Sequence, residues 1–140
     1  DERGRIVDAG GIQLALRALR EHPDSAKVQG CAASALGNLA CHTVGSPDHA
    51  LPEGIELIVA ALRVHADDKE VQERCLGALQ SLSCEGAENR QRLFELGGAE
   101  LIPHTMSVHK DLEKVQVAGA VILARLATDG RGQCASIFAA

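Results

Sequence analysis

An internal repeat constrains the fold of this chain more than any other feature of its sequence. The segments 26–40, 69–83 and 113–127 align without a gap, and the Val-Gln pair that they share recurs after 43 and then 44 residues. The same spacing relates three glycines and three histidines upstream of these pairs, namely Gly11, Gly54 and Gly98, and His22, His65 and His109. A period of about 40–47 residues is typical of arrays in which small helical units stack on one another.

Within each repeat the apolar residues recur with a helical period. We expect one buried stripe on each third helix, formed in the first repeat by Val28, Ala32, Ala35 and Leu39 and anchored in the others by the pairs Val71/Leu82 and Val115/Leu126. Each repeat is predicted to contain a short first helix, a glycine turn, a second helix that ends near the histidine, a polar loop and a long third helix. The glycines at 11, 54 and 98 are expected at the turns, because a left-handed backbone costs glycine nothing.

The composition favours closely packed helices. Apolar residues make up 46% of the 140 residues but aromatic residues only 1%, so the core has to be built from Ala, Leu, Ile and Val. A sandwich or barrel normally draws on aromatic and β-branched residues. The length fits one compact unit, so we expect a single domain.

Two segments carry a resemblance to a known family. The sequence "ENRQRLFELGG" (Glu88–Gly98) is similar to the first helix and turn of an armadillo repeat, and "VQGCAASALGNLA" (Val28–Ala40) is similar to its third helix. The chain therefore resembles the armadillo-repeat family, which includes importin-α, β-catenin and many adaptor proteins. The resemblance implies an all-α fold, a right-handed armadillo superhelix (α-solenoid) of about three three-helix repeats in one domain, 1–140. The repeats would span approximately 1–43, 44–86 and 87–130, and 131–140 would begin a further repeat.

Two places depart from the family pattern. The stretch Gly45–Gly54 contains two prolines and a single glycine at its expected turn, which makes it a poor first helix. Pro103 stands where the other repeats have Leu16 and Val59, so we expect the second helix of the third repeat to kink or to start late.

Charge and cysteine content limit the partner and the compartment. The net charge of −5 provides no basic face for nucleic acid or an anionic membrane, so basic or neutral partners fit better. No apolar run reaches the roughly 18 residues that would span a bilayer. The five cysteines are odd in number and include no C-x-x-C pair, so we interpret them as buried, reduced thiols of a cytoplasmic or nuclear protein.

The equivalent histidines do not predict a metal site. Equivalent positions of stacked helices lie roughly 8–10 Å apart, whereas zinc ligands converge on one ion at about 2 Å. A histidine at a helix C-terminus, favoured by the helix dipole and free carbonyls, is the simpler interpretation. The same spacing excludes a disulfide between Cys41 and Cys84, which we expect to be small core residues.

The segment around residue 46 does not predict catalysis. Ser46, Asp48 and His49 are the residue types of a hydrolase triad but lack its strand–turn–helix setting. Ser46-Pro47 forms at most a proline-directed phosphorylation site, and a plain turn is the simpler interpretation. We expect no catalytic residue, no metal and no cofactor.

The resemblance places the functional surface on a concave face lined by the third helices. The residues expected on that stripe are Lys27, Cys31, Ser34 and Asn38, then Glu70, Arg74, Gly77 and Ser81, then Lys114, Ala118, Val121 and Arg125. Within it we assign peptide binding to Ser34, Asn38, Arg74, Ser81 and Arg125. In the family, an Asn at the position of Asn38 reaches the backbone of an extended peptide. The Trp that import receptors place one turn earlier is replaced by Ser34, Gly77 and Val121, which disfavours a lysine-rich import signal.

These observations predict a non-enzymatic scaffold for a protein or an extended peptide. The two arginines of the stripe favour a segment that carries a carboxylate or phosphate. Two alternatives stay open: an interior structural segment of a longer solenoid, and a regulatory arm of a multidomain protein such as a kinase or GTPase. The apolar Ile137 and Phe138 near the end of the chain also predict end-to-end self-association.

Overall fold

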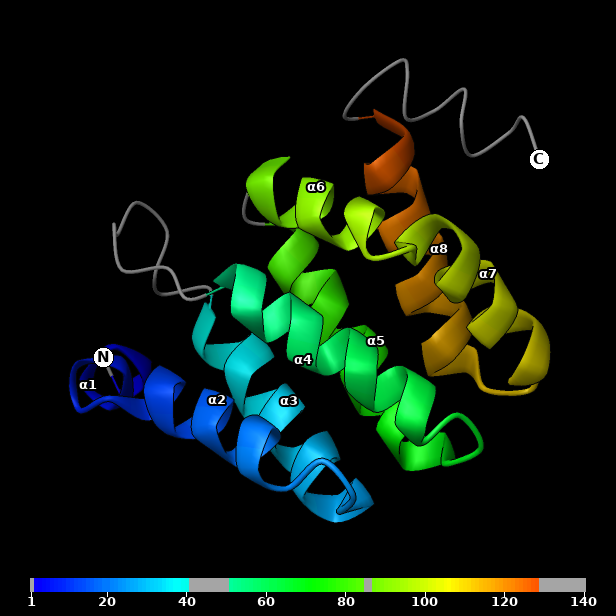
Figure 1. Cartoon of the computed structure of the whole chain (residues 1–140). Helices are drawn as coiled ribbons and strands as arrows, with labels where there is room; N and C mark the ends of the chain where they lie inside the picture. Colours follow the sequence, from blue (N-terminus) through cyan, green and yellow to red (C-terminus); the bar gives the residue numbers. More distant parts are fainter. Residues whose placement is uncertain (1, 41–50, 85–86, 129–140) are drawn as a thin grey trace.

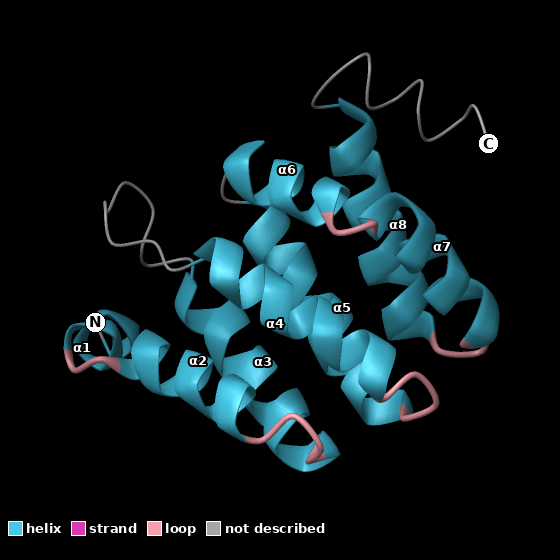
Figure 2. Cartoon of the chain, viewed as in Figure 1, coloured by secondary structure: helices cyan, strands magenta, loops and turns pink. Residues whose placement is uncertain are grey.

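The computed structural model describes residues 2–40, 51–84 and 87–128. Of these described residues, 86% are helical and none is in a strand (Figure 2). The helices are α1 (Glu2–Asp8), α2 (Gly11–Glu21), α3 (Ala26–Ala40), α4 (Leu51–Val64), α5 (Lys69–Cys84), α6 (Ala87–Glu95), α7 (Gly98–Val108) and α8 (Glu113–Thr128). The prediction of an all-α fold is confirmed.

The long third helices of the three repeats pack side by side. Helix α5 lies between α3 and α8 and contacts both, as Figure 1 shows. Helices α2, α4 and α7 each pack on the third helix of their own repeat, while α4 also contacts α2 and α6. The repeats therefore stack in chain order, and each repeat packs against the preceding one.

The buried stripe is largely as expected but differs in the first repeat. Leu39, Val71, Leu82, Val115 and Leu126 are all buried. Val28 is only half-buried, however, and Ala35 is exposed. The position of Ala35 corresponds to Ala78, which packs against Gly37 of the preceding third helix. No described helix precedes α3 in the stack, so this position stays open in the first repeat.

The turn glycines lie one residue earlier than expected. Gly10 and Gly97 have φ of 88° and 86°, in the left-handed region that favours glycine. Gly11 and Gly98 instead open α2 and α7 and approach the preceding helix too closely to carry a side chain. The expectation of a turn at Gly54 is wrong, because this residue lies inside α4. A Cβ there would lie 2.7 Å from Cδ2 of Leu36, so close packing of helices is what requires glycine at this position.

The prolines disturb the helices less than expected. The late start predicted for the second helix of the third repeat is wrong, because α7 begins at Gly98 and runs for 11 residues, as α2 does. Pro103 lies inside α7 with its ring exposed. Pro52 stands in the first turn of α4, where its missing N–H breaks no helical bond. Of the expected poor first helix at Gly45–Gly54, residues 45–50 lie outside the described residues, and 51–54 belong to α4.

The repeated Val-Gln pair has a structural explanation in its glutamine. The amide Nε2 of Gln72 donates to the carbonyl oxygens of Leu62 (3.2 Å) and His65 (2.9 Å) at the end of α4. Gln29 and Gln116 make the equivalent bonds in their own repeats, at 2.8–3.2 Å. Each glutamine thus satisfies carbonyls that the end of a second helix leaves without an intrahelical partner.

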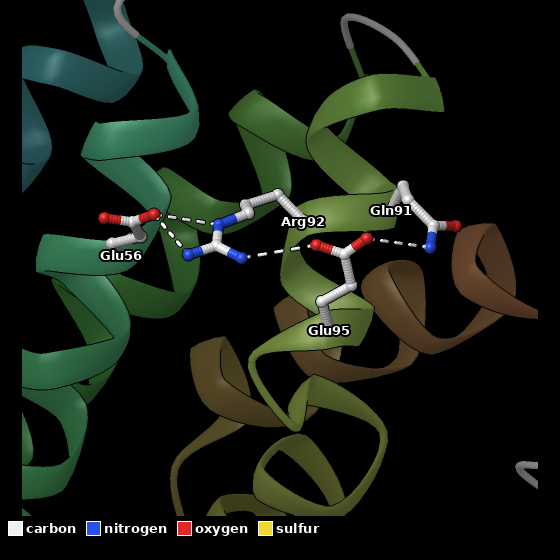
Figure 3. Close-up of polar contacts among 4 residues, drawn as sticks. All are labelled: Glu56, Gln91, Arg92 and Glu95. Atoms are coloured by element: carbon white, nitrogen blue, oxygen red, sulfur yellow. Dashed lines mark hydrogen bonds and ion pairs between the residues drawn. The ribbon is translucent and has the colours of Figure 1, made fainter.

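An ion-pair cluster joins α4 to α6 on the side away from α5. Arg92 donates through Nε to Glu56 Oε1 at 2.9 Å and through Nη1 to Glu95 at 3.2 Å, and Gln91 donates to Glu95 (Figure 3). The hydrogen bonds from Arg92 to Glu56 and then to Glu95 raise the pKa of Arg92 above its ordinary value. Those from Gln91 and then Arg92 lower the pKa of Glu95. Arg92 is therefore a charged link between the second and third repeats.

Candidate functional site

A hollow of about 570 Å³ lies across α3 and α5 and reaches α8. It is lined by Ser34, Gly37, Asn38, Glu70, Glu73, Arg74, Gly77, Ala78, Ser81 and Lys114. The third helices supply every one of these residues, because their 43- and 44-residue spacing brings equivalent turns alongside one another. We call this hollow, with its continuation along α8, the third-helix groove.

Four of the five residues predicted to bind a peptide line this groove together. Ser34 and Asn38 come from α3, and Arg74 and Ser81 from α5. The fifth, Arg125, lies on α8 outside the lining residues. Its Nη1 donates to the carbonyl oxygen of Gln80 and, at 3.1 Å, to the hydroxyl oxygen of Ser83.

The guanidinium of Arg125 is one of three groups that hold the end of α5. Asn89 Nδ2 donates to the carbonyl oxygen of Leu82 at 3.1 Å, and Arg90 Nη1 donates to that of Ser83 at 2.7 Å. A helix C-terminus favours cations and needs donors for its last carbonyls. Arg125 therefore joins α8 to α5, a role that its place on the predicted stripe does not indicate.

The guanidinium of Arg74 is also engaged within the chain. Its Nη2 lies 3.0 Å from Glu70 Oε1, one helical turn away, and its Nη1 lies 3.8 Å from Cys31 Sγ. The expected anion site would need both Arg74 and Arg125 with free N–H groups facing the groove. Arg125 does not line the hollow, so the structure does not bring the two guanidinium groups together in it.

Two residues in the middle of the groove are open to a ligand. The side chain of Asn38 is exposed and makes no hydrogen bond to another described residue. A Cβ added to Gly77 would meet no atom within 4 Å. By contrast, a Cβ added to Gly37 would lie 2.9 Å from Cα of Ala78. The close packing of α3 on α5 therefore requires glycine at 37, whereas the space beside Gly77 is unoccupied.

The groove continues into a second hollow of about 700 Å³ along α8. Its lining includes Glu73, Gly77 and Lys114, which it shares with the first hollow, and Gln80, Asp111, Leu112, Glu113, Val117 and Ala118. Sequence reasoning missed most of these residues because it followed one narrow stripe on each helix. Val117 is 52% exposed, whereas Ala118, which was expected on the surface, is 3% exposed and forms the floor.

This continuation is acidic. Glu73, Asp111 and Glu113 have no ion-pair partner in the described part of the chain, and Lys114 is the one cation among the residues that line it. Carboxylates in a recess attract a cationic ligand more strongly than they would on an open surface. The side chains of the groove without an ion-pair partner are therefore mostly negative, whereas its arginines suggested a positive groove.

The cysteines are not uniformly buried, so that expectation is wrong for two of them. Cys75 is fully buried, and burial first, with the charge of Asp68 second, raises the pKa of its thiol to about 12. Cys31 and Cys84 are exposed free thiols, because they stand at the groove rim and at the end of α5. Cys41 and Cys134 lie outside the described residues.

Two of the three equivalent histidines, His65 and His109, contact carbonyl groups. His65 Nε2 lies 2.9 Å from the carbonyl oxygen of Pro23, and His109 Nε2 lies 2.8 Å from that of Ala66. Among residues 2–40, 51–84 and 87–128, no group of three or more His, Cys, Asp or Glu is arranged to hold a metal ion. Ser46, Pro47, Asp48 and His49 lie outside these ranges.

None of the described helices is long and apolar enough to cross a bilayer. Comparisons of the chain with protein-family models, with curated proteins and with solved structures find no match.

Proposed function

We propose that this chain is part of an armadillo-type α-solenoid, a right-handed stack of three-helix repeats, and that it binds an extended protein segment in the third-helix groove. Binding would consist of presenting a preformed surface, with no catalysis and no cofactor. The observation that carries the proposal is the groove itself, in which Ser34, Asn38, Arg74 and Ser81 line one hollow. Equivalent side chains on successive helices suit a ligand that is itself extended.

Asn38 and Gly77 suggest how such a segment would be held. A side-chain amide both donates and accepts, so the exposed amide of Asn38, which bonds to no other described residue, can bond the N–H and C=O of a peptide group. The space above Gly77 lets a peptide backbone approach α5 closely. Side chains of the segment would then extend toward α3 on one side and α8 on the other.

The charge of the groove favours a basic or neutral segment. Glu73, Asp111 and Glu113 have no ion-pair partner in the described part of the chain, while Arg74 pairs with Glu70. The exposed Val117 beside them adds an apolar contact. We therefore propose a segment that places a basic residue next to an aliphatic one, in place of the carboxylate or phosphate suggested by the sequence.

A cytoplasmic or nuclear setting belongs to the same proposal. Exposed free thiols persist in reducing compartments, and Cys31 and Cys84 are both exposed and unpaired.

Selection from a displayed library of random linear peptides tests the groove. Recovered peptides should bind the chain with modest, roughly micromolar affinity. Gly77→Trp, which fills the open space, should weaken their binding at least tenfold, and the smaller Gly77→Ala should weaken it far less. Glu73→Lys should weaken the binding of peptides that carry a basic residue, and added salt should weaken the same binding.

Two results would contradict the proposal. Peptides that bind Gly77→Trp and Asn38→Ala normally, but fail to bind variants of Arg17, Arg63 or Glu100, would place the site on the second helices. Selection that yields no groove-dependent peptide would favour an interior structural segment or a regulatory arm.

A further inference from the structure

A separate hollow of about 220 Å³ lies between α4 and α7 and shares no lining residue with the third-helix groove. Its wall is formed by the end of α4, the loop that follows it, one face of α7 and Gln72 of α5. Helix α4 packs on α2 but scarcely contacts α7, and this leaves the space between the second and third repeats. The hollow therefore lies inside the stack, between two described repeats.

Thr105 is a buried polar residue in the wall of this hollow. It is 4% exposed, and its hydroxyl makes no hydrogen bond to another described residue. The equivalent positions of the other two second helices hold Ala18 and Ala61. A buried hydroxyl without a partner costs free energy, and alanine at this position avoids that cost. Helix packing therefore does not explain the hydroxyl of Thr105.

Two buried acceptors line the hollow together with this hydroxyl. His109 follows Thr105 by one helical turn on the same side of α7 and is 8% exposed. Because its Nε2 donates to the carbonyl oxygen of Ala66, Nδ1 of the neutral ring carries no proton and accepts. Gln72 donates through Nε2 to the end of α4, so its oxygen is an acceptor. Neither Nδ1 of His109 nor Oε1 of Gln72 has a donor among the described residues.

The hollow also has an aliphatic wall, formed by Leu62, Leu101 and Val108. Water that lies against these side chains lacks hydrogen-bond partners on that side, so an apolar group should displace it favourably. The charged side chains of the lining are Arg63 and Asp67, both exposed and opposite in sign. The charge of the hollow therefore favours a neutral ligand.

We propose that this hollow binds a small neutral molecule in which a primary amide is joined to a short aliphatic group. The two N–H groups of the amide donate to His109 Nδ1 and Gln72 Oε1, and its carbonyl oxygen accepts from the hydroxyl of Thr105. The aliphatic group packs on the aliphatic wall. This site is independent of the third-helix groove and of what binds there.

Titration of isovaleramide into the nitrogen-15-labelled 140-residue chain, followed by NMR of the backbone amides, tests the proposal. Saturable shifts should appear at residues 101–109 and in the loop 65–68, with a roughly millimolar dissociation constant. The matched probe is 4-methyl-2-pentanone, which has the same shape but a methyl group in place of the NH₂ group. It should bind at least tenfold more weakly, because it leaves both acceptors without a donor.

Variants of two hydroxyl groups on α7 complete the test. Thr105→Val keeps the shape of the side chain but removes its hydroxyl, so it should weaken isovaleramide binding about tenfold. Its thermal midpoint should equal or exceed that of wild type, because no hydrogen bond to the described chain is lost. Ser107→Ala, which removes an exposed hydroxyl outside the hollow, should leave binding unchanged.

Three results would overturn the proposal. Absence of saturable shifts at about 50 mM isovaleramide would mean that the hollow holds only water. Equal binding of the amide and the ketone would mean that the polar groups of the wall recognise nothing. Undiminished binding to Thr105→Val would mean that the amide lies elsewhere on the chain.

Discussion

The ring Nε2 of His109 lies 2.8 Å from the carbonyl oxygen of Ala66, which joins the end of α7 to the loop of the preceding repeat. A carbonyl oxygen only accepts, so this nitrogen carries the proton and donates. His65 makes the same contact with Pro23 at 2.9 Å. The histidines that recur in the sequence therefore belong to the interfaces between repeats as well as to the ends of helices.

His109→Ala should lower the free energy of unfolding by about 1–2 kcal/mol, because it removes a hydrogen bond at a buried position. His22→Ala is the matched control, since the side chain of His22 is exposed and makes no hydrogen bond to another described residue, and it should change stability by less than about 0.5 kcal/mol. Urea unfolding at low protein concentration measures both. Equal losses in the two variants would mean that the contact with Ala66 contributes nothing.

Gln72→Ala should cost about 1–3 kcal/mol, because it removes the amide donor from the buried carbonyl of Leu62 and leaves the half-buried carbonyl of His65 with only the N–H of Asp68. The control is Gln13→Ala on the exposed face of α2, which should lie within about 0.5 kcal/mol of wild type. Urea unfolding followed by circular dichroism reports both losses. If Gln72→Ala is no worse than Gln13→Ala, water replaces the amide and the recurring glutamines do not stabilise the stack.

The sequence predicts local features of this fold well, because they depend on periodicity. The third helices expected at 26–40, 69–83 and 113–127 are observed at Ala26–Ala40, Lys69–Cys84 and Glu113–Thr128. Exposure of Ala35 could not be predicted in this way, since it depends on which helix lies alongside. The role of Gly54 was missed for the same reason: its partner Leu36 belongs to another repeat.

The groove was predicted only in part. Equivalent spacing was enough to bring Asn38, Arg74 and Ser81 together. The partners of Arg125 lie 42 and 45 residues away in the chain, and no local pattern links them to it. The acidic residues along α8 were missed because the groove is wider than one stripe of a helix.

Leu82→Ala should destabilise the chain by about 2–5 kcal/mol, because Leu82 is fully buried in the middle third helix and its loss leaves a cavity. Leu14→Ala removes the same atoms from a side chain that is 62% exposed and should cost less than about 1 kcal/mol. Chemical unfolding of both variants gives the difference. A small loss for Leu82→Ala would show that this position does not anchor the core.

Gly77→Ala and Gly37→Ala should have effects of opposite sign, although both glycines lie within third helices. Alanine at 77 meets open space and should stabilise the helix by about 0.5–1 kcal/mol, because glycine is the more flexible residue in the unfolded chain. Alanine at 37 would press on the backbone of Ala78 and should destabilise the α3–α5 contact by about 1–3 kcal/mol. Thermal unfolding of the two variants checks the sign, and stabilisation by both would mean that α3 and α5 are less closely packed.

The buried thiol of Cys75 should make stability fall at alkaline pH. Its pKa in the folded chain is about 12, raised from 9.0 by burial and then by Asp68, so between these values the thiol ionises in the unfolded chain but not in the folded one. The contribution is therefore constant below about pH 9 and is lost as pH rises toward 12, amounting to about 1 kcal/mol between pH 8 and 10. Urea unfolding at both pH values measures this loss for wild type, Cys75→Ala and the exposed control Cys31→Ala. Cys75→Ala should show a pH-dependent loss smaller by about that amount, and Cys31→Ala should follow wild type. Parallel pH dependence in all three chains would mean that Cys75 ionises as readily in the folded chain as in the unfolded one.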